Sequence, residues 1–112
     1  MKSLTAAVLL MGACASVAQQ GTLRESLSID SQILGKPVEY SIYLPHDFES
    51  SSRLYPVLYL LHGYTDDETG WTQFGEVKSI ADNLIGDVSV TSMIIAMPDA
   101  GLDWYILSLI HI

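Results

Sequence analysis

The chain has 112 residues, of which 49% are hydrophobic, and a formal net charge of −8 at pH 7. The acidic balance argues against binding to nucleic acids or anionic membranes, which are recognised by clustered Lys and Arg side chains. The sequence contains one cysteine, which rules out an internal disulfide and therefore a small disulfide-stapled scaffold. We expect a protein that is held together by its hydrophobic core.

Residues 1–18 have the pattern of a secretory signal peptide. Lys2 supplies the positive charge, Leu4 to Ala13 the apolar stretch, and Ser16 to Ala18 a cleavage site of small residues. The apolar stretch is shorter than the roughly 20 residues that a membrane-spanning helix needs. We therefore expect an exported protein, periplasmic or extracellular, whose mature chain starts at Gln19. The alternative is a lipoprotein signal, in which Cys14 would carry a lipid anchor and provide the protein's only membrane contact.

Two alternating segments follow the signal peptide. Residues Leu23 to Gln32 alternate in part, and in Val38 to Leu44 the apolar residues are those at even positions, with Glu39, Ser41 and Tyr43 between them. Turn-forming residues from Leu34 to Pro37 separate the two segments. This arrangement predicts an antiparallel hairpin.

The next elements predict a parallel strand-helix-strand unit. Pro56 to Leu61 is apolar on both faces, which is typical of a central strand covered by helices on both sides. A helical stripe predicts a helix from about Phe74 to Ile85, ended by Gly86, and Met93 to Met97 is a second apolar run. We therefore expect an α/β sheet that begins with antiparallel strands. Such sheets bind ligands at the carboxyl ends of their strands, where His62 to Trp71 and Pro98 to Tyr105 would lie.

Three motifs of this sequence resemble a known family. The segments YSIYLP, YPVLYLLHGYTDDETGW and MIIAMPDAGLDWY are similar to the exported esterases of the α/β-hydrolase superfamily. These include feruloyl, acetyl-xylan and tributyrin esterases, with esterase D and the mycolyltransferases as more distant relatives. The motifs keep the family's order and spacing, and the resemblance extends from Leu23 to Tyr105.

The resemblance implies an oxyanion hole after the third strand. In that fold the loop at this place contributes a backbone N–H that stabilises the negative charge formed during ester cleavage. The resemblance gives this role to the N–H of Tyr64. Gly63 precedes it and, lacking a Cβ atom, would let the backbone turn sharply and approach a ligand. His62 is expected to brace the loop, because the family's catalytic histidine comes near the end of the full domain.

Four residues of the two loops are candidates for substrate binding, namely Gly63, Thr65, Trp71 and Trp104. The two tryptophans are either core residues or rim aromatics that would cover an aromatic acyl group or a sugar ring. We interpret Asp66, Asp67 and Glu68 as solvated charges at the rim or at a helix start, because no histidine or further carboxylate lies at ligand spacing. We expect no metal and no other cofactor.

The nucleophile of this family lies in a Gly-x-Ser-x-Gly turn, which this sequence lacks. The tail Leu107 to Ile112 has the sequence that a transposase mosaic-end adapter encodes in one reading frame. We therefore interpret residues 19–106 as the N-terminal portion of an esterase domain, truncated before the nucleophile, and residues 107–112 as adapter-derived. This 112-residue chain is expected to be inactive by itself, because the serine, acid and histidine of the triad are absent from it.

The expected activity of the full-length protein is hydrolysis of a carboxylic ester through a serine nucleophile. The expected substrate is a feruloyl or acetyl ester on plant cell-wall polysaccharide, or a small-molecule ester of a short-chain acid. Two alternatives remain open: an acyltransferase of the same fold, which would pass the acyl group to a sugar, and a non-catalytic exported module that binds a surface or a carbohydrate.

Overall fold

The computed structural model describes residues 19–102 and Tyr105. The predicted signal peptide with Cys14, the predicted adapter tail and Trp104 lie outside the described residues, and the proposed domain boundaries remain predictions. Within the described part of the chain, neither helix has the length and apolar character needed to cross a bilayer.

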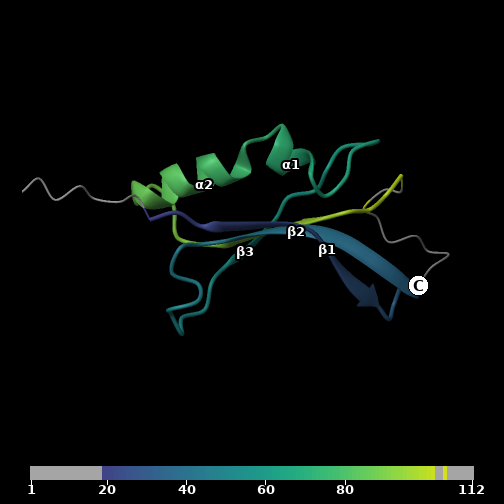
Figure 1. Ribbon diagram of the computed structural model, residues 1–112, viewed down its shortest axis with the longest axis horizontal. Helices are drawn as coiled ribbons and strands as arrows, with labels where there is room; N and C mark the ends of the chain where they lie inside the picture. The colour runs from purple at the N-terminus through teal and green to yellow at the C-terminus, as the bar shows by residue number, and fades with distance from the viewer. Residues whose placement is uncertain (1–18, 103–104, 106–112) are drawn as a thin grey trace, which may run out of the picture.

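The described residues form a mixed four-stranded sheet with two helices on one of its faces (Figure 1). The strands lie in the order β1-β2-β4-β3, with β1 and β2 antiparallel, β2 and β4 antiparallel, and β3 and β4 parallel. The predicted hairpin and the predicted parallel pair are both confirmed. The elements are β1 (Thr22–Ser31), β2 (Lys36–Leu44), β3 (Val57–Tyr59), α1 (Gly70–Gln73), α2 (Val77–Gly86) and β4 (Ile94–Pro98).

A β-bulge interrupts β1 where it passes the end of α1. Arg24 pairs with Ile42 and Leu27 with Tyr40, so two residues, Glu25 and Ser26, stand opposite the single residue Ser41. Ser26 has φ 50°, and its N–H donates to the hydroxyl of Ser41 at 3.3 Å. The bulge therefore supplies a hydrogen-bond donor to Ser41, which is fully buried.

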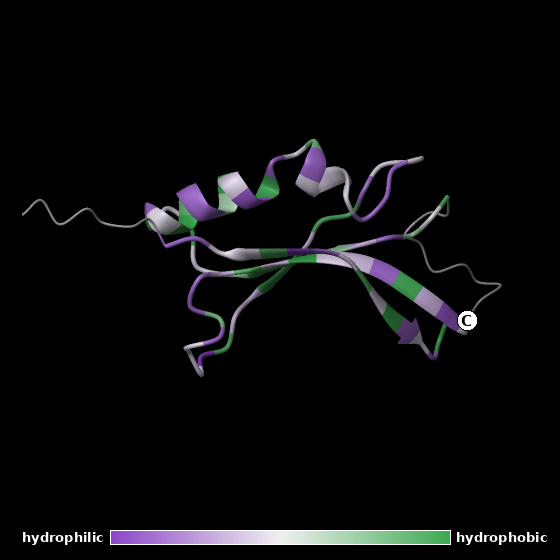
Figure 2. Ribbon diagram, in the orientation of Figure 1, coloured by the Kyte–Doolittle hydropathy of each residue, from purple (hydrophilic) through white to green (hydrophobic). Residues whose placement is uncertain are grey.

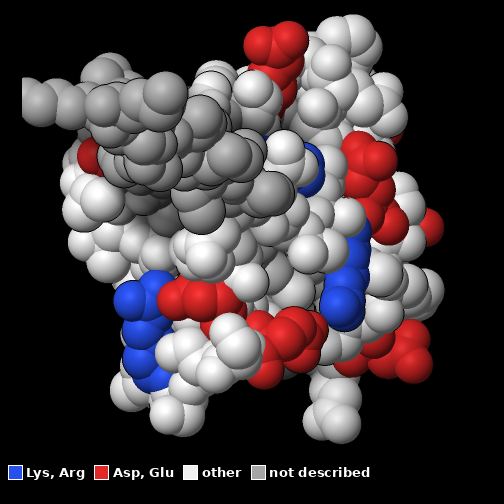
Figure 3. Space-filling view, turned by 60° about the vertical axis from the view of Figure 1, so that its left-hand side comes forward, with Lys and Arg blue, Asp and Glu red and all other residues white. Residues whose placement is uncertain are grey.

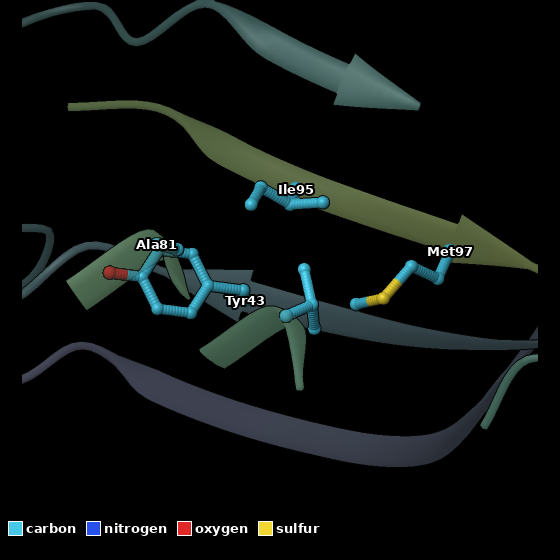
Figure 4. Packing of buried hydrophobic residues seen from close by; sticks show 5 residues of the cluster. Tyr43, Ala81, Ile95 and Met97 are labelled. Atoms are coloured by element: carbon cyan, nitrogen blue, oxygen red, sulfur yellow. The ribbon is translucent and has the colours of Figure 1, made fainter. Parts of the chain in front are cut away.

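The core lies between the sheet and α2. Tyr43, Val77, Ala81, Ile95 and Met97 form its buried cluster, most of which is seen in Figure 4. The alternation in β2 sets its even positions apart as apolar, but it is Tyr43, at an odd position, that packs in this cluster. Hydrophobic and hydrophilic residues alternate along the strands as expected (Figure 2), but β2 has a partly covered second face, so the alternation alone does not identify the helix side.

The predicted helix from about Phe74 to Ile85 corresponds to α2, which starts at Val77, and the short α1 before it was not predicted. Phe74 caps the short α1, and Glu76, with φ 48°, caps the start of α2 in a left-handed conformation. A left-handed residue ends the regular hydrogen-bond ladder. The predicted stripe is correct within α2, where Val77 and Ala81 are buried, but Ile80 and Leu84 remain 51% and 41% exposed.

The strand β3 was expected to be central, but in the described sheet it lies at the edge. Val57, Leu58 and Tyr59 are 46%, 43% and 65% exposed, because the described chain provides a neighbour on one side only. Beside β3 an apolar groove of about 290 Å³ runs under α2, lined in part by Leu58, Trp71 and Leu84. Apolar side chains that line this groove, among them Leu58 and Leu84, thus remain partly exposed in the described part of the chain.

Asp82 of α2 joins the helix to the start of β1 and to β2. Its Oδ1 accepts hydrogen bonds from the Gly21 N–H at 2.7 Å and from the Tyr43 hydroxyl at 2.9 Å, and its Oδ2 lies 2.6 Å from Lys78 Nζ. Burial raises the pKa of Asp82, but the hydrogen bonds from Lys78, Gly21 and Tyr43 outweigh this and hold its pKa below the ordinary value. Burial, followed by the hydrogen bond to Asp82, raises the pKa of Tyr43.

Basic side chains are interspersed with acidic ones on the face shown in Figure 3. Arg24 pairs with Glu49, Arg53 with Asp47, and Lys78 with Asp82. The absence of a nucleic-acid partner remains a prediction from the overall charge.

Candidate active site

The two loops that the sequence singled out leave the sheet at the same edge. β3 and β4 are parallel, with Tyr59 paired to Ala96, and the Leu60 N–H donates to the Ala96 carbonyl at 2.9 Å. Parallel strands end on the same side of a sheet, and ligands bind there in α/β proteins. The loops that follow, 60–69 and 99–102, therefore form one candidate site.

His62 connects these two loops, as predicted for a brace. Its side chain is 3% exposed, with Nδ1 2.8 Å from the Gly63 carbonyl oxygen. Its Nε2 lies 3.0 Å from the Ala100 backbone nitrogen and 3.1 Å from Asp99 Oδ1. The ring of Tyr105 packs edge-on against it, with centroids 5.3 Å apart. One buried imidazole thus holds the loops after β3 and β4 together.

Gly63 to Asp66 form a tight turn that presents Tyr64 to solvent. The Asp66 N–H donates to the Gly63 carbonyl at 3.1 Å, which places Tyr64 and Thr65 at the two central positions. Tyr64 is 67% exposed. Thr65 has φ 71°, a conformation that costs a residue with a Cβ atom roughly 1–2 kcal/mol. Backbone strain of this kind clusters at functional sites.

Gly63 does not make the sharp turn that was expected of it. Its φ is not in the left-handed region, since among the glycines of the described residues only Gly35 and Gly101 have positive φ. A Cβ atom added at Gly63 would meet no atom within 4 Å apart from those of its two chain neighbours. The sharp turn is therefore made at Thr65, and the space beside Gly63 is open for an approaching group.

The acidic run separates into different environments. Asp66 and Asp67 are exposed, as expected, and hydrogen bonds from the side chain and backbone of Thr69 hold the pKa of Asp67 below its usual range. Glu68 contradicts the prediction of a solvated charge: it is 5% exposed, and its Oε1 accepts the Ser26 hydroxyl at 2.7 Å. In the folded chain Glu68 is therefore buried against the bulge of β1.

Folding also brings carboxylates together that are distant in sequence. One oxygen each from Glu39, Glu68 and Asp99 lies within 4.8 Å of the others, and within the described residues this is the group that could hold a cation. Sequence spacing did not predict this cluster, because Glu39 and Asp99 are distant from Glu68 along the chain. Glu68 already accepts a hydrogen bond from Ser26, and Asp99 accepts one from the Gly101 N–H at 2.7 Å.

Trp71 lies on α1 and contacts the interior side of the loop. Its Nε1–H donates to the Leu61 carbonyl at 3.1 Å, and its ring lines the apolar groove beside β3. Trp71 is 39% exposed, so it is neither a fully buried core residue nor a fully exposed residue of the rim. A role of Trp71, Thr65 or Gly63 in binding substrate remains a prediction.

Sequence reasoning missed the contribution of β1 to the site. Thr72 of α1 donates its hydroxyl to Glu25, next to the bond between Ser26 and Glu68. Both residues of the bulge therefore anchor the segment that follows the predicted oxyanion loop. A signal existed in the sequence: Glu25 stands where the alternation from Leu23 to Leu27 would place an apolar residue.

Comparison with known proteins identifies the fold and the family. A ferulic acid esterase of known structure superposes with a TM-score of 0.69 and 34% identity over 75% of this chain and 32% of its own. The ferulic acid esterase of Anaeromyces mucronatus superposes with a TM-score of 0.65 and 23% identity, over 79% of this chain and 32% of its own. An S-formylglutathione hydrolase from Staphylococcus aureus superposes with a TM-score of 0.57 and 20% identity, over 73% of this chain and 32% of its own. The sheet order, the placement of the helices and these neighbours define an α/β-hydrolase fold.

Within that fold, the chain belongs to the Esterase family, whose model matches residues 31–106. A curated endo-1,4-beta-xylanase/feruloyl esterase of Xylanibacter ruminicola is 37% identical over 71 residues, which make up 60% of this chain and 10% of that protein. The chain thus spans a tenth of the length of this relative and about a third of the solved relatives.

Proposed function

We propose that the protein is a serine-dependent carboxylic ester hydrolase and that this chain supplies the oxyanion-hole side of its active site. The observation that carries the proposal is the match to the Esterase family over residues 31–106, with His62-Gly63-Tyr64 at the carboxyl end of β3. In the proposed reaction, a serine outside this chain attacks the ester carbonyl, the alcohol leaves, and water releases the acid from the acyl-enzyme.

The Tyr64 N–H is proposed to stabilise the oxyanion of both steps. A donor fixed before the reaction does not need to reorganise as the charge forms, and the loss of one such donor typically raises the barrier by roughly 3–4 kcal/mol. The open space beside Gly63 supports this role, because it leaves room for a reacting carbonyl next to the Gly63–Tyr64 peptide.

The proposed substrate is a feruloyl or acetyl ester on plant cell-wall polysaccharide. Support comes from two relatives above 30% identity, one named as an endo-1,4-beta-xylanase/feruloyl esterase and the other as a ferulic acid esterase. We further propose that the protein is exported through residues 1–18, with cleavage before Gln19 or, alternatively, lipid attachment at Cys14. The intact mass of the secreted product distinguishes the two.

The test is to extend the reading frame beyond Ile106 in adapter-trimmed DNA and to purify the encoded protein. We expect a Gly-x-Ser-x-Gly turn followed by an acid and a histidine, hydrolysis of 4-nitrophenyl acetate and methyl ferulate, and labelling of the serine by a fluorophosphonate. A purified full-length protein that folds but hydrolyses neither ester would overturn the proposal. Activity on the acetyl ester alone would retain the hydrolase and remove the feruloyl substrate.

A further inference from the structure

The contacts of His62 define which of its ring nitrogens carries a hydrogen. The Gly63 carbonyl oxygen, 2.8 Å from Nδ1, can only accept a hydrogen bond, and the Ala100 N–H, 3.0 Å from Nε2, can only donate one. Nδ1 must therefore carry the hydrogen and Nε2 must be the acceptor. Both conditions are met by the neutral imidazole in its Nδ1–H form.

The contact with Asp99 is not compatible with this arrangement as a hydrogen bond. Asp99 Oδ1 lies 3.1 Å from Nε2, and it could accept a hydrogen bond only from a ring that carries a hydrogen on Nε2. Such a ring would lose its bond from the Ala100 N–H, which would then have no acceptor at that position. In the neutral form Asp99 Oδ1 accepts instead from the Gly101 N–H at 2.7 Å. We favour the neutral form because the Ala100 amide can serve only as a donor.

The hydrogen bond from Nδ1 acts on the same peptide unit as the candidate oxyanion donor. The carbonyl of Gly63 and the N–H of Tyr64 belong to one planar trans peptide, so they point in opposite directions. The carbonyl is held by two donors, His62 Nδ1 and, at 3.1 Å, the Asp66 N–H. Fixing the direction of the carbonyl also fixes the direction of the Tyr64 N–H, which points away from His62.

The ring itself has little freedom to turn. Its side chain is 3% exposed, the Ala100 N–H holds Nε2, and the ring of Tyr105 packs against it at an interplanar angle of 69°. Tyr105 is in turn held by its hydroxyl, which donates to the Pro98 carbonyl at 2.7 Å. The end of β4 therefore sets the orientation of His62.

We propose that His62 is a positioning residue for ester hydrolysis: its neutral Nδ1–H form holds the Gly63 carbonyl and thereby aims the Tyr64 N–H at the oxyanion. The inference rests on the proposed function, since it assigns His62 a role in that reaction. It predicts that the bond to Gly63 matters for turnover and that the bond from Ala100 matters mainly for holding the ring.

Two substitutions separate the bonds of His62. His62→Asn places an amide N–H near the position of Nδ1, where it can donate to Gly63, but does not reach Ala100. His62→Gln places its amide near the position of Nε2, where the oxygen can accept from Ala100, but offers no donor to Gly63. His46→Asn, at an exposed histidine, is the matched control.

The variants are made in the full-length protein, and hydrolysis of 4-nitrophenyl acetate is measured. We expect His62→Gln to lose about 100-fold in kcat with little change in KM, since misplacement of a catalytic group by about 1 Å has an effect of this size. His62→Asn should stay within roughly tenfold of wild type, and His46→Asn should match wild type. Equal losses in the two His62 variants, or a larger loss in His62→Asn, would overturn the inference.

Nitrogen-15 spectra of the histidine side chains provide a readout that does not depend on activity. We expect the His62 hydrogen on Nδ1, and a hydrogen on Nε2 would overturn the inference. An inactive wild-type protein would remove the proposed function and the inference with it. An active wild-type protein whose variants do not separate as described would remove the inference alone.

Discussion

The carboxylate of Asp82 is expected to be the polar side chain whose removal destabilises the fold most. Its Oδ1 accepts hydrogen bonds from two buried donors, the Gly21 amide and the Tyr43 hydroxyl. Tyr43 as a whole residue is 1% exposed. Asp82→Ala leaves both donors without this acceptor, whereas Asp82→Asn keeps an oxygen at the same place. The two substitutions should therefore differ strongly.

The expected size follows from the burial of the donors. Each buried donor left without a partner costs about 1–3 kcal/mol, so two of them cost about 2–6 kcal/mol in Asp82→Ala. The ion pair with Lys78 adds little, because the Lys78 side chain is 35% exposed and solvent screens the interaction. Asp82→Asn should therefore cost less than about 1 kcal/mol. The larger loss is comparable to the whole stability of a small domain, which starts at about 5 kcal/mol.

The assay is urea unfolding of the purified protein at low micromolar concentration, with Asp30→Ala at an exposed position of β1 as control. The control should change the free energy of unfolding by at most about 0.5 kcal/mol. The folded pKa of Asp82 is lowered, so its stabilisation is present above the ordinary aspartate pKa of about 3.9 and is lost as the pH falls below it. The difference between wild type and Asp82→Ala should shrink in that range. Equal stability of the alanine and asparagine variants at neutral pH would refute the reasoning.

Three further predictions concern other parts of the molecule. Gly63→Ala should change the free energy of unfolding by at most about 0.5 kcal/mol. It should nonetheless lower ester turnover by the full-length protein, since the added methyl enters open space beside the candidate donor. Gly35→Ala, at φ 63°, should by contrast cost about 1–2 kcal/mol of stability. The exposed edge strand β3 should make the 112-residue chain self-associate, and Leu58→Lys should weaken this association in sedimentation experiments. An equal effect of Leu34→Lys in the hairpin turn would show that β3 is not responsible. The pKa of Tyr43 is raised, so its neutral hydroxyl stabilises the fold fully below about pH 10 and progressively less above it, and Tyr43→Phe should remove this alkaline loss in urea unfolding.

Most of the fold could be predicted from local patterns. The hairpin turn around Gly35 and the apolar run at β4 are signals within a few residues, and both elements are present with bounds shifted by one or two residues. The faces of β2 could not be predicted in the same way, since Ser41 is buried and receives a hydrogen bond from the bulge residue Ser26 of another strand. Burial of a polar residue depends on partners that the alternation pattern does not contain.

The candidate site was found only in part for the same reason. His-Gly after an apolar run marked the loop, and the placement of His62 as a brace is confirmed by its contacts with the loop after β4. Glu68 was misread because its sequence neighbours, Asp66 and Asp67, are exposed, while its own environment is set by Ser26, 42 positions away. The start of α2 was predicted at about Phe74 and lies at Val77, because a hydrophobic stripe gives the helical face but not the residue at which the helix starts.

The extra residue in the first strand has a consequence for comparing sequences. Glu25 and Ser26 share one opposite residue, so a homologue with a single residue there would pair its flanking positions unchanged and keep the same side chains toward α2. An alignment would record only a one-position gap, which resembles harmless variation in strand length. Such a gap would nonetheless leave a single hydrogen bond, in place of two, between the amino-terminal hairpin and the residues from Glu68 to Thr72 at and before α1.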